Sequence, residues 1–301
     1  MKLVSIVSVK DDVEVIGPSV RNRLEAGFDE VVVIAVEPSA EMRAAAASLA
    51  DAAGGRVHTV LIDALDPAGD FLSFEAEPMR SVLAATRPDW LLLTDADEFV
   101  VAAVADLHDA PELAGEGPLS LQRYNYARRT DETAETMLAR LADPAGLPLI
   151  AERRIAMKNG LPVPGVRWSE HRISPRPFFR PRSTRRFDVG AHHLIGPDGT
   201  RLRAEGAAGI LIAHLPFTSL SRFERKMENV RAHLTAIGGV HAATAAHWKH
   251  WLTRLEEGRL AEEFAREAFT EDEFAARAGT GAVATAAVLF ERLAAADRSV
   301  R

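Results

Sequence analysis

Two aspartates that lie two residues apart, Asp95 and Asp97, directly follow an apolar run in the segment WLLLTDADEF (90–99). Such acids either cap a following helix or bind a ligand at the end of a buried strand. In an extended backbone, residues i and i+2 point to the same side. Two carboxylates on one side suit a hard divalent cation, which completes its shell with water and substrate phosphate oxygens. The spacing therefore predicts a metal-bound diphosphate, whose leaving-group charge the cation would neutralise.

A basic segment, residues 152–203, contrasts with the acidic remainder of the chain. Twelve Lys or Arg residues against four acids give this segment a charge of about +8, and the net charge of −7 leaves about −15 elsewhere. This asymmetry predicts an anionic ligand near the segment, with a solvated surface as the alternative. We expect no nucleic-acid partner, because the chain is acidic overall and shows no recognised binding motif.

The composition is that of a globular protein, with 301 residues of which 47% are hydrophobic and 26% charged. The absence of cysteine excludes disulfides, a thiolate nucleophile and cysteine-ligated zinc. No apolar run approaches the roughly 20 residues of a transmembrane helix, and the N-terminus turns acidic too early for a signal peptide. We therefore expect a soluble cytoplasmic protein without a transmembrane segment.

The first 130 residues alternate between apolar runs and helix-like segments. The predicted strands are Leu3–Val9, Glu30–Val36, Arg56–Ile62 and Trp90–Thr94. The predicted helices start near Pro18, at the N-cap Ser39 and at about Ser73, and they end at Ala26, Gly54 and Thr86. This alternation predicts an α/β fold with a doubly wound, mostly parallel sheet. Ligands of such sheets bind at the carboxyl ends of the strands, where Asp95 and Asp97 would lie.

The pattern changes after Gly117. The segment 118–127 alternates like a strand, and 131–144 resembles a helix. A loop rich in proline and arginine follows, with short strands expected at 177–180 and 187–194. A turn at 196–200 and a last strand at 209–215 precede an amphipathic helix with apolar residues three and four apart: Leu220, Phe223, Met227, Val230, Leu234 and Ile237. The remaining residues are helical in character.

The segment DWLLLTDADEFV (89–100) resembles the DxD segment of bacterial family 2-like glycosyltransferases with the GT-A fold, in the subgroup whose motif is DxDEF. Residues 9–42 resemble the opening of that family, which has Lys/Arg-Asn-Glu, a helix, a strand and then DNGSTDGT. RPFFRP (176–181), GAHH (190–193) and ILIAHLPFTSLSRFERKM (210–227) follow in the family's order. The resemblance covers about residues 2–230. It implies a GT-A-type α/β fold with C-terminal helices and metal-dependent sugar transfer from a nucleotide diphosphate.

The resemblance also implies roles for individual residues. Asp95 and Asp97 match the DxD positions, which are expected to contact the donor ribose and a Mn²⁺ or Mg²⁺ ion, and Glu98 matches the acid that supports them. His214 matches the family's late histidine and is expected to be a further metal ligand. A buried histidine that closes a strand is the alternative. Lys226 matches the family's closing lysine.

Two segments depart from the family pattern. Lys10 is retained after the first strand, but Asp11 stands where the family has asparagine. The sequence VEPS replaces DNGS, so Glu37 stands where an acid or amide contacts the nucleotide, and Pro38 removes a backbone donor. We still expect Lys10, Asp11, Glu37 and Ser39 to bind the donor, with an altered pocket for the base.

A second anion site is expected near the helix that begins around Thr218. A helix N-terminus with Arg222, Arg225 and Lys226 nearby would suit a diphosphate. We expect Arg222 and Lys226 to bind substrate, although a solvated helix face is the alternative for at least one of the three. Arg153, Arg154 and Arg180 are further candidates to bind phosphates or an anionic acceptor.

A single-displacement transfer also needs a base for the acceptor hydroxyl. Glu170 is favoured because it lies in a basic stretch between Trp168 and His171, and Asp131 is the second candidate. Glu132, Asp188 and His192 are less favoured.

We therefore expect three regions: a nucleotide-sugar half (1–128), an acceptor and phosphate half (129–216) and a helical region (217–301), through which a homodimer could form. The expected donor is a UDP-, GDP- or dTDP-linked sugar, and the acceptor is not specified. The altered loops keep open a GT-A-like protein that binds a nucleotide sugar or a partner without catalysis. A phosphatase of the haloacid dehalogenase type is a second alternative, since such enzymes also have a strand followed by Asp-x-Asp.

Overall fold

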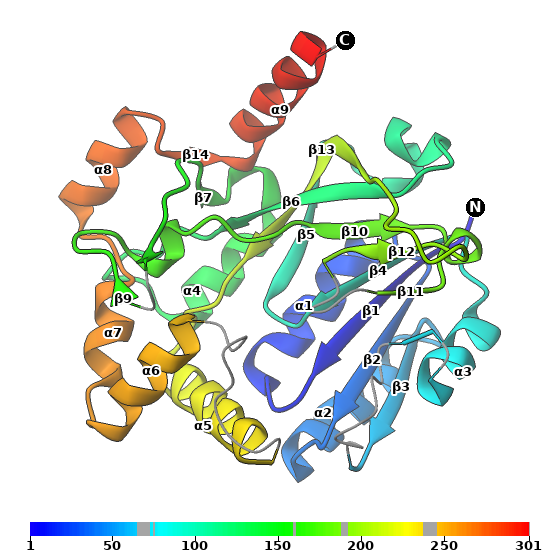
Figure 1. The fold of residues 1–301 in the computed structure, drawn as a ribbon, viewed down its shortest axis with the longest axis horizontal. Helices are drawn as coiled ribbons and strands as arrows, with labels where there is room; N and C mark the ends of the chain where they lie inside the picture. Colours follow the sequence, from blue (N-terminus) through cyan, green and yellow to red (C-terminus); the bar gives the residue numbers. More distant parts are fainter. Residues whose placement is uncertain (65–72, 75, 159–160, 188–191, 237–245, 301) are drawn as a thin grey trace. The chain divides into compact units, whose positions relative to one another are not determined.

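The computed structural model describes residues 1–64, 73–74, 76–158, 161–187, 192–236 and 246–300 (Figure 1). The chain forms two compact units. Unit 1 consists of Met1–Arg123, Ser174–Ala213 and the terminal segment Phe290–Arg301, and unit 2 of Tyr124–Ile173 and His214–Leu289. No helix in the described part of the chain has both the length and the apolar character needed to cross a membrane.

Unit 1 begins with four parallel strands and the helices that connect them. In chain order these elements are β1 (Leu3–Val9), α1 (Val13–Glu25), β2 (Glu30–Val36), α2 (Ala40–Ala52), β3 (Val57–Ile62), α3 (Glu77–Thr86) and β4 (Trp90–Asp95). The strands pair in parallel in the order β3-β2-β1-β4 (Figure 1). The four predicted strands are confirmed almost to the residue.

The sheet continues to eight strands, in the order β3-β2-β1-β4-β10-β6-β13-β5. The added strands are β5 (Glu98–Ala102), β6 (Leu119–Asn125), β10 (Arg176–Phe179) and β13 (Glu205–His214). β10 pairs antiparallel with both β4 and β6. A small hairpin of β11 (Arg186–Phe187) and β12 (Leu194–Ile195) completes unit 1. The predicted fold class is confirmed: a mixed α/β protein with a mostly parallel sheet and C-terminal helices.

The sheet of unit 1 has an apolar core on each face. Consecutive residues of a strand point to opposite faces, so Leu92 joins one cluster with Phe178, and Leu91 joins the other with Phe179. Central strands buried on both faces are continuous apolar runs, which is why the sequence predicts them well.

Two predicted helix starts differ from the structure. α1 begins at Val13, so Pro18 lies inside the helix instead of at its start. Proline cannot donate the hydrogen bond that an interior position needs, yet this helix tolerates it. α3 begins at Glu77, after the expected start at Ser73. The N-cap of α2 is confirmed, because the Ser39 side chain accepts a hydrogen bond from the Met42 N–H.

Unit 2 contains short strands and most of the C-terminal helices. Its elements are α4 (Ala134–Ala139), β7 (Pro148–Ile150), β8 (Met157–Lys158), β9 (Leu161–Pro162), α5 (Leu220–Ala236), α6 (Ala246–Glu256), α7 (Leu260–Arg266), α8 (Glu271–Gly279) and β14 (Val283–Thr285). The last helix, α9 (Ala286–Val300), spans the boundary between the units. The amphipathic pattern of α5 is confirmed, since Phe223, Met227 and Leu234 are buried.

Candidate functional site

The carboxyl ends of three neighbouring parallel strands meet at one edge of the sheet in unit 1. Ser8 of β1 lies opposite Asp95 of β4, and Val9 of β1 lies opposite Ala35 of β2. The residues that follow these positions therefore lie beside one another. This edge is where open α/β sheets bind their ligands.

Two contacts join the loops that follow β1 and β2. Lys10 Nζ donates to Glu37 Oε2 at 2.9 Å, and the Ser39 backbone N–H donates to Asp11 Oδ1 at 2.9 Å. Glu37 has a φ of 45°, a left-handed conformation that is uncommon outside glycine and that clusters at functional sites. The structure therefore brings together the four residues predicted to bind the nucleotide, and their binding role stays a prediction.

The carboxylates after β4 lie in a tight turn, which we call the carboxylate turn (residues 95–98). β4 ends at Asp95, Ala96 and Asp97 form the turn, and β5 begins at Glu98. The Asp95 side chain is 57% exposed, whereas Asp97 and Glu98 are buried. The extended backbone that would point both aspartates to one side therefore ends at Asp95. The alternative of an acidic helix cap is excluded, because a strand follows the turn.

Glu98 holds the carboxylate turn together from inside the protein. Its side chain is fully buried and forms ion pairs with Arg123 and with Arg176, whose Nε lies 2.8 Å from Glu98 Oε2. The same oxygen accepts a hydrogen bond from the Asp95 backbone N–H at 3.2 Å. Arg176 also reaches the exposed carboxylate, with Nη2 at 2.5 Å from Asp95 Oδ2. Glu98 therefore supports the turn, as the resemblance implies for this position.

The side chain of a third arginine supports the turn by a hydrogen bond to the backbone of the turn. Arg23 of α1 is fully buried, and its Nη2 donates to Thr94 Oγ1 at 2.5 Å and to the Glu98 carbonyl at 2.6 Å. Its Nε donates to Ser5 Oγ at 3.1 Å. Desolvation lowers the pKa of Arg23 to about 10, against the opposing attraction of Glu98 and Asp95. Arg23 therefore stays protonated at neutral pH.

The pKa of the Asp95 carboxyl is raised above its ordinary value. Desolvation is the largest cause, followed among the raising effects by repulsion from Glu98 and Asp97, while Arg176 acts in the opposite direction. The Asp95 side chain is 57% exposed, so repulsion between the neighbouring carboxylates contributes to this rise beside desolvation. A cation bound at the turn would relieve this repulsion.

The donor set at the turn fits a hard divalent cation. Asp95 and Asp97 supply carboxylate oxygens, which suit Mg²⁺ and Mn²⁺. Among the described residues, no group of three or more His, Asp or Glu side chains could hold a metal ion. Sites for Mg²⁺ often use only one or two carboxylates and leave the other positions to water and substrate phosphate. A bound cation would share Asp95 with the Arg176 guanidinium.

His214, the third predicted metal ligand, is buried in unit 2 at the end of β13. Its Nδ1 lies 2.7 Å from Asn125 Oδ1, and Asn125 Nδ2 donates to the Ser169 carbonyl at 2.7 Å. Because Asn125 uses its amide as donor to Ser169, its Oδ1 acts as acceptor and Nδ1 of His214 carries the hydrogen. In this tautomer the lone pair lies on Nε2, the nitrogen a metal would bind. Asp95 and Asp97 belong to unit 1, so the three-ligand set stays a prediction.

The two candidate bases lie in different surroundings within unit 2. Glu170 is fully buried, forms an ion pair with Arg277 at 2.6 Å and accepts the Arg167 backbone N–H at 2.9 Å. These contacts argue for a structural role. The Asp131 side chain is 68% exposed and pairs with Arg129 at 3.2 Å. The base stays a prediction, and accessibility favours Asp131.

The basic residues near the start of α5 also differ in their surroundings. Arg222 is buried, and its Nη1 donates to the carbonyls of Leu215 and Pro216 at 3.2 Å. The Ser219 hydroxyl accepts the Arg222 N–H, so this donor at the helix N-terminus is already used. Lys226 is partly exposed. Lys226 is therefore better placed than Arg222 to meet a substrate.

The three other arginines proposed for anion binding have contacts within their own units. Arg153 stacks over the Tyr124 ring at 4.2 Å, and Arg154 pairs with Glu152 at 3.1 Å. Arg180 stacks over Trp90 at 4.7 Å. All three guanidinium groups therefore already contribute to packing or ion pairing.

The residues that organise the site were largely missed from the sequence. The roles of Arg23, Arg123, Arg176 and Asn125 follow only from tertiary contacts. Arg176 carried one usable signal, because it directly precedes the strand expected at 177–180 and opens the segment RPFFRP (176–181). Of the less favoured base candidates, Glu132 is buried against Tyr126, and Asp188 lies outside the described residues.

No protein family model matches the chain, and no curated protein sequence matches it. Among solved structures, it is similar to the mannosyltransferase PcManGT from Pyrobaculum calidifontis in complex with GDP-Man and Mn²⁺, with 16% identity and a TM-score of 0.39. That alignment covers 93% of this chain and 79% of the other. It is also similar to S. aureus TarS 1–349, with 14% identity, coverage of 86% and 71%, and a TM-score of 0.36. Similarities of this size are too low to assign an activity to the chain.

Proposed function

We propose that this protein is a metal-dependent glycosyltransferase that moves a sugar from a nucleotide diphosphate to an acceptor hydroxyl, by a single displacement that inverts the anomeric centre. The observation that carries the proposal is the carboxylate turn. Asp95 and Asp97 lie at the carboxyl end of β4, and Glu98 and three buried arginines hold them there. A protein keeps so many buried charges at a ligand-binding edge of a sheet at considerable energetic cost, which favours a functional reason.

The chain's own groups divide the work of this reaction. Asp95 and Asp97 would hold Mg²⁺ or Mn²⁺, and the metal when bound would neutralise charge on the leaving diphosphate. The joined loops that contain Lys10, Glu37 and Ser39 would bind the nucleotide, because they follow β1 and β2 at the sheet edge where β4 also ends.

Residues of unit 2 would complete the reaction. Asp131 would take the proton of the acceptor hydroxyl, since its carboxylate is exposed. His214 would present Nε2 to the metal, and Lys226 would meet the diphosphate. In this proposal residues 1–128 bind the donor, residues 129–216 bind the acceptor and phosphates, and residues 217–301 form a helical region.

One observation favours a second candidate, a protein of the same fold that binds a nucleotide sugar without turnover. Arg176 contacts Asp95, and Lys10 pairs with Glu37, so the loops satisfy much of their own charge. Such a protein would bind UDP, GDP or dTDP but release no nucleotide from the corresponding sugars.

The test measures nucleoside diphosphate release from UDP-, GDP- and dTDP-linked sugars, with Mn²⁺ or Mg²⁺ and with EDTA. We expect release from at least one donor that needs the metal and falls at least about a hundredfold in Asp97→Asn, the loss typical of removing a key electrostatic group. Asp63→Asn is the matched control, because Asp63 is an exposed carboxylate paired with Arg43. Binding without release supports the second candidate, and neither binding nor release contradicts both.

A further inference from the structure

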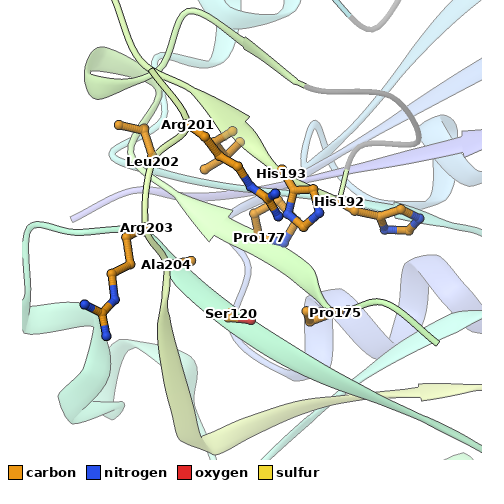
Figure 2. A pocket seen from close by; sticks show the side chains of 10 residues that line it. Ser120, Pro175, Pro177, His192, His193, Arg201, Leu202, Arg203 and Ala204 are labelled. Atoms are coloured by element: carbon orange, nitrogen blue, oxygen red, sulfur yellow. The ribbon is translucent and has the colours of Figure 1, made fainter. Parts of the chain in front are cut away.

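Unit 1 contains a cavity of ≈ 390 Å³ that the carboxylate turn does not line. Its wall includes His192 and His193 directly before β12, Arg201 and Arg203 after it, and Ser120 of β6. Figure 2 shows the Arg201 side chain extending toward His193 and Pro177, while the Arg203 side chain extends in another direction.

The charged side chains that line this cavity are all positive. The residues that line it include two arginines and no aspartate or glutamate. Neither Arg201 nor Arg203 has a carboxylate partner in the described part of the chain, and both are exposed. Unpaired guanidinium groups in a concave site favour phosphate or carboxylate ligands, which match their planar arrangement of donors.

At this cavity, part of the positive charge of the basic segment (residues 152–203) is not neutralised by a carboxylate of the described residues. Several arginines of residues 152–203 are already paired within their own units: Arg154 with Glu152, Arg167 with Glu273, Arg176 with Asp95, and Arg182 with Glu116. Arg201 and Arg203 differ from these arginines, because both line the cavity and neither has a carboxylate partner among the described residues. An anion bound in the cavity would supply the negative charge that these two arginines lack.

The rest of the lining suits a small organic anion. Pro175, Pro177, Leu194 and Leu202 give apolar surface, and the Ser120 side chain offers a hydroxyl. Such a mixture of apolar rings, a hydroxyl and guanidinium groups is typical of sites for ligands that have both an apolar face and an anionic group.

Two prolines of the cavity lining are neighbours, along the chain, of an arginine that contacts the carboxylate turn. Pro175 and Pro177 of the lining flank Arg176, which contacts Asp95 and Glu98. Desolvation, followed by the positive charges of Arg176 and Arg123, lowers the pKa of His192 to about 4. The negative charge of Glu98 acts in the opposite direction. His192 is therefore neutral at pH 7, and the arginines supply the positive charge.

We propose that this cavity binds the phosphate or carboxylate group of a sugar acceptor, through Arg201 and Arg203. Calling the ligand an acceptor rests on the proposed glycosyl transfer, whereas anion binding itself does not.

The test titrates the full-length protein with inorganic phosphate, glucose 6-phosphate, glucuronate and glucose, without metal or nucleotide, and follows binding by calorimetry. We expect at least one of the charged sugars to bind at least tenfold more tightly than glucose. The preferred charged sugar distinguishes a phosphate site from a carboxylate site. Arg201→Gln should weaken this binding at least tenfold, and Arg203→Gln should also weaken it.

The matched control is Arg21→Gln, because Arg21 is an exposed arginine of α1 outside the cavity. Arg21→Gln should bind the charged sugars as the wild type does. Because neither metal nor nucleotide is present in this titration, its result is independent of whether the protein transfers sugars. Equal binding of glucose and its charged relatives, no binding of either charged sugar up to millimolar concentration, or unchanged binding in Arg201→Gln would each overturn the proposal.

Discussion

Glu98 connects the exposed Asp95 to the interior of unit 1. It accepts the backbone N–H of Asp95 and pairs with Arg123 and Arg176, while its carbonyl accepts from Arg23. A buried carboxylate with two arginine partners stabilises a structure only while all charges remain paired. The geometry of the candidate site and the stability of unit 1 therefore depend on the same residue.

The Glu98→Gln variant should lower the free energy of unfolding by about 3–5 kcal/mol, because it leaves buried guanidinium groups without their counter-charge. Urea denaturation followed by circular dichroism measures this change. Glu116→Gln is the control, since Glu116 is 76% exposed in its pairs with Arg180 and Arg182; it should change stability by no more than about 1 kcal/mol. Equal effects of the two substitutions would contradict the role given to Glu98.

His247 of α6 makes the stability of unit 2 depend on pH. Desolvation, followed by the charges of Lys226, His171 and His214, lowers the pKa of His247 from 6.5 to about 3. The folded protein therefore keeps this imidazole neutral, while the unfolded chain protonates it below about pH 6.5. Stability from this group is present above pH 6.5 and is lost as the pH falls toward 3.

The His247→Gln variant should show a smaller loss of stability between pH 6.5 and about 4 than the wild type. The measurement is the free energy of unfolding by urea at several pH values, from which the difference between the two proteins isolates this residue. Parallel curves would show that His247 titrates normally.

Of these residues, Asp95 and Asp97 could be predicted from the sequence, because acids directly after a buried strand are conspicuous. The arginines could not be predicted, since Arg176 and Asp95 lie 81 residues apart along the chain. A pairing over such a distance depends on the order of strands in the sheet, in which β10 lies next to β4. Glu170 lies in a basic stretch of the sequence, but the closest partner of its buried carboxylate is Arg277 of α8, which the sequence does not indicate.

Among the three helices predicted in the first 130 residues, α1 is the one whose start differs most from the structure. Gly17 and Pro18 are typical of a helix start, yet both lie within Val13–Glu25. Local propensity favours a start near these residues, and tertiary packing overrides it, because Val15 and Ile16 before them are buried. The four parallel strands, by contrast, could be predicted because burial on both faces leaves a continuous apolar run.

Gly17→Ala should stabilise the protein by about 0.5–1 kcal/mol, because alanine lowers the entropic cost of a helix interior. A Cβ atom at this position would meet nothing within 4 Å. Gly27→Ala should instead be destabilising, since Gly27 has a φ of +103° and its Cβ would lie 2.3 Å from Asp106 Oδ1. Thermal and urea unfolding of both variants measure the contrast. Destabilisation by Gly17→Ala would contradict the interior position of Gly17 in α1.

Considered as a whole molecule, the chain does not divide at simple points along its sequence. Unit 1 takes up Ser174–Ala213 from the middle of the chain, because β10 lies between β4 and β6. Boundaries near 128 and 216 were expected from changes in pattern, and such changes carry no information about a later segment that returns to the first sheet. The division into donor, acceptor and helical regions and the homodimer stay predictions.

The central claim is that the carboxylate turn binds a divalent cation together with a nucleoside diphosphate. The most direct measurement is calorimetric titration of the protein with UDP, GDP and dTDP, with Mn²⁺ present or with EDTA. We predict that at least one of them binds with Mn²⁺, that EDTA abolishes this binding, and that Asp95→Asn and Asp97→Asn lose it while Asp63→Asn keeps it. Binding that is unchanged by EDTA and by both substitutions at the turn, or no binding of any of the three, would contradict the claim.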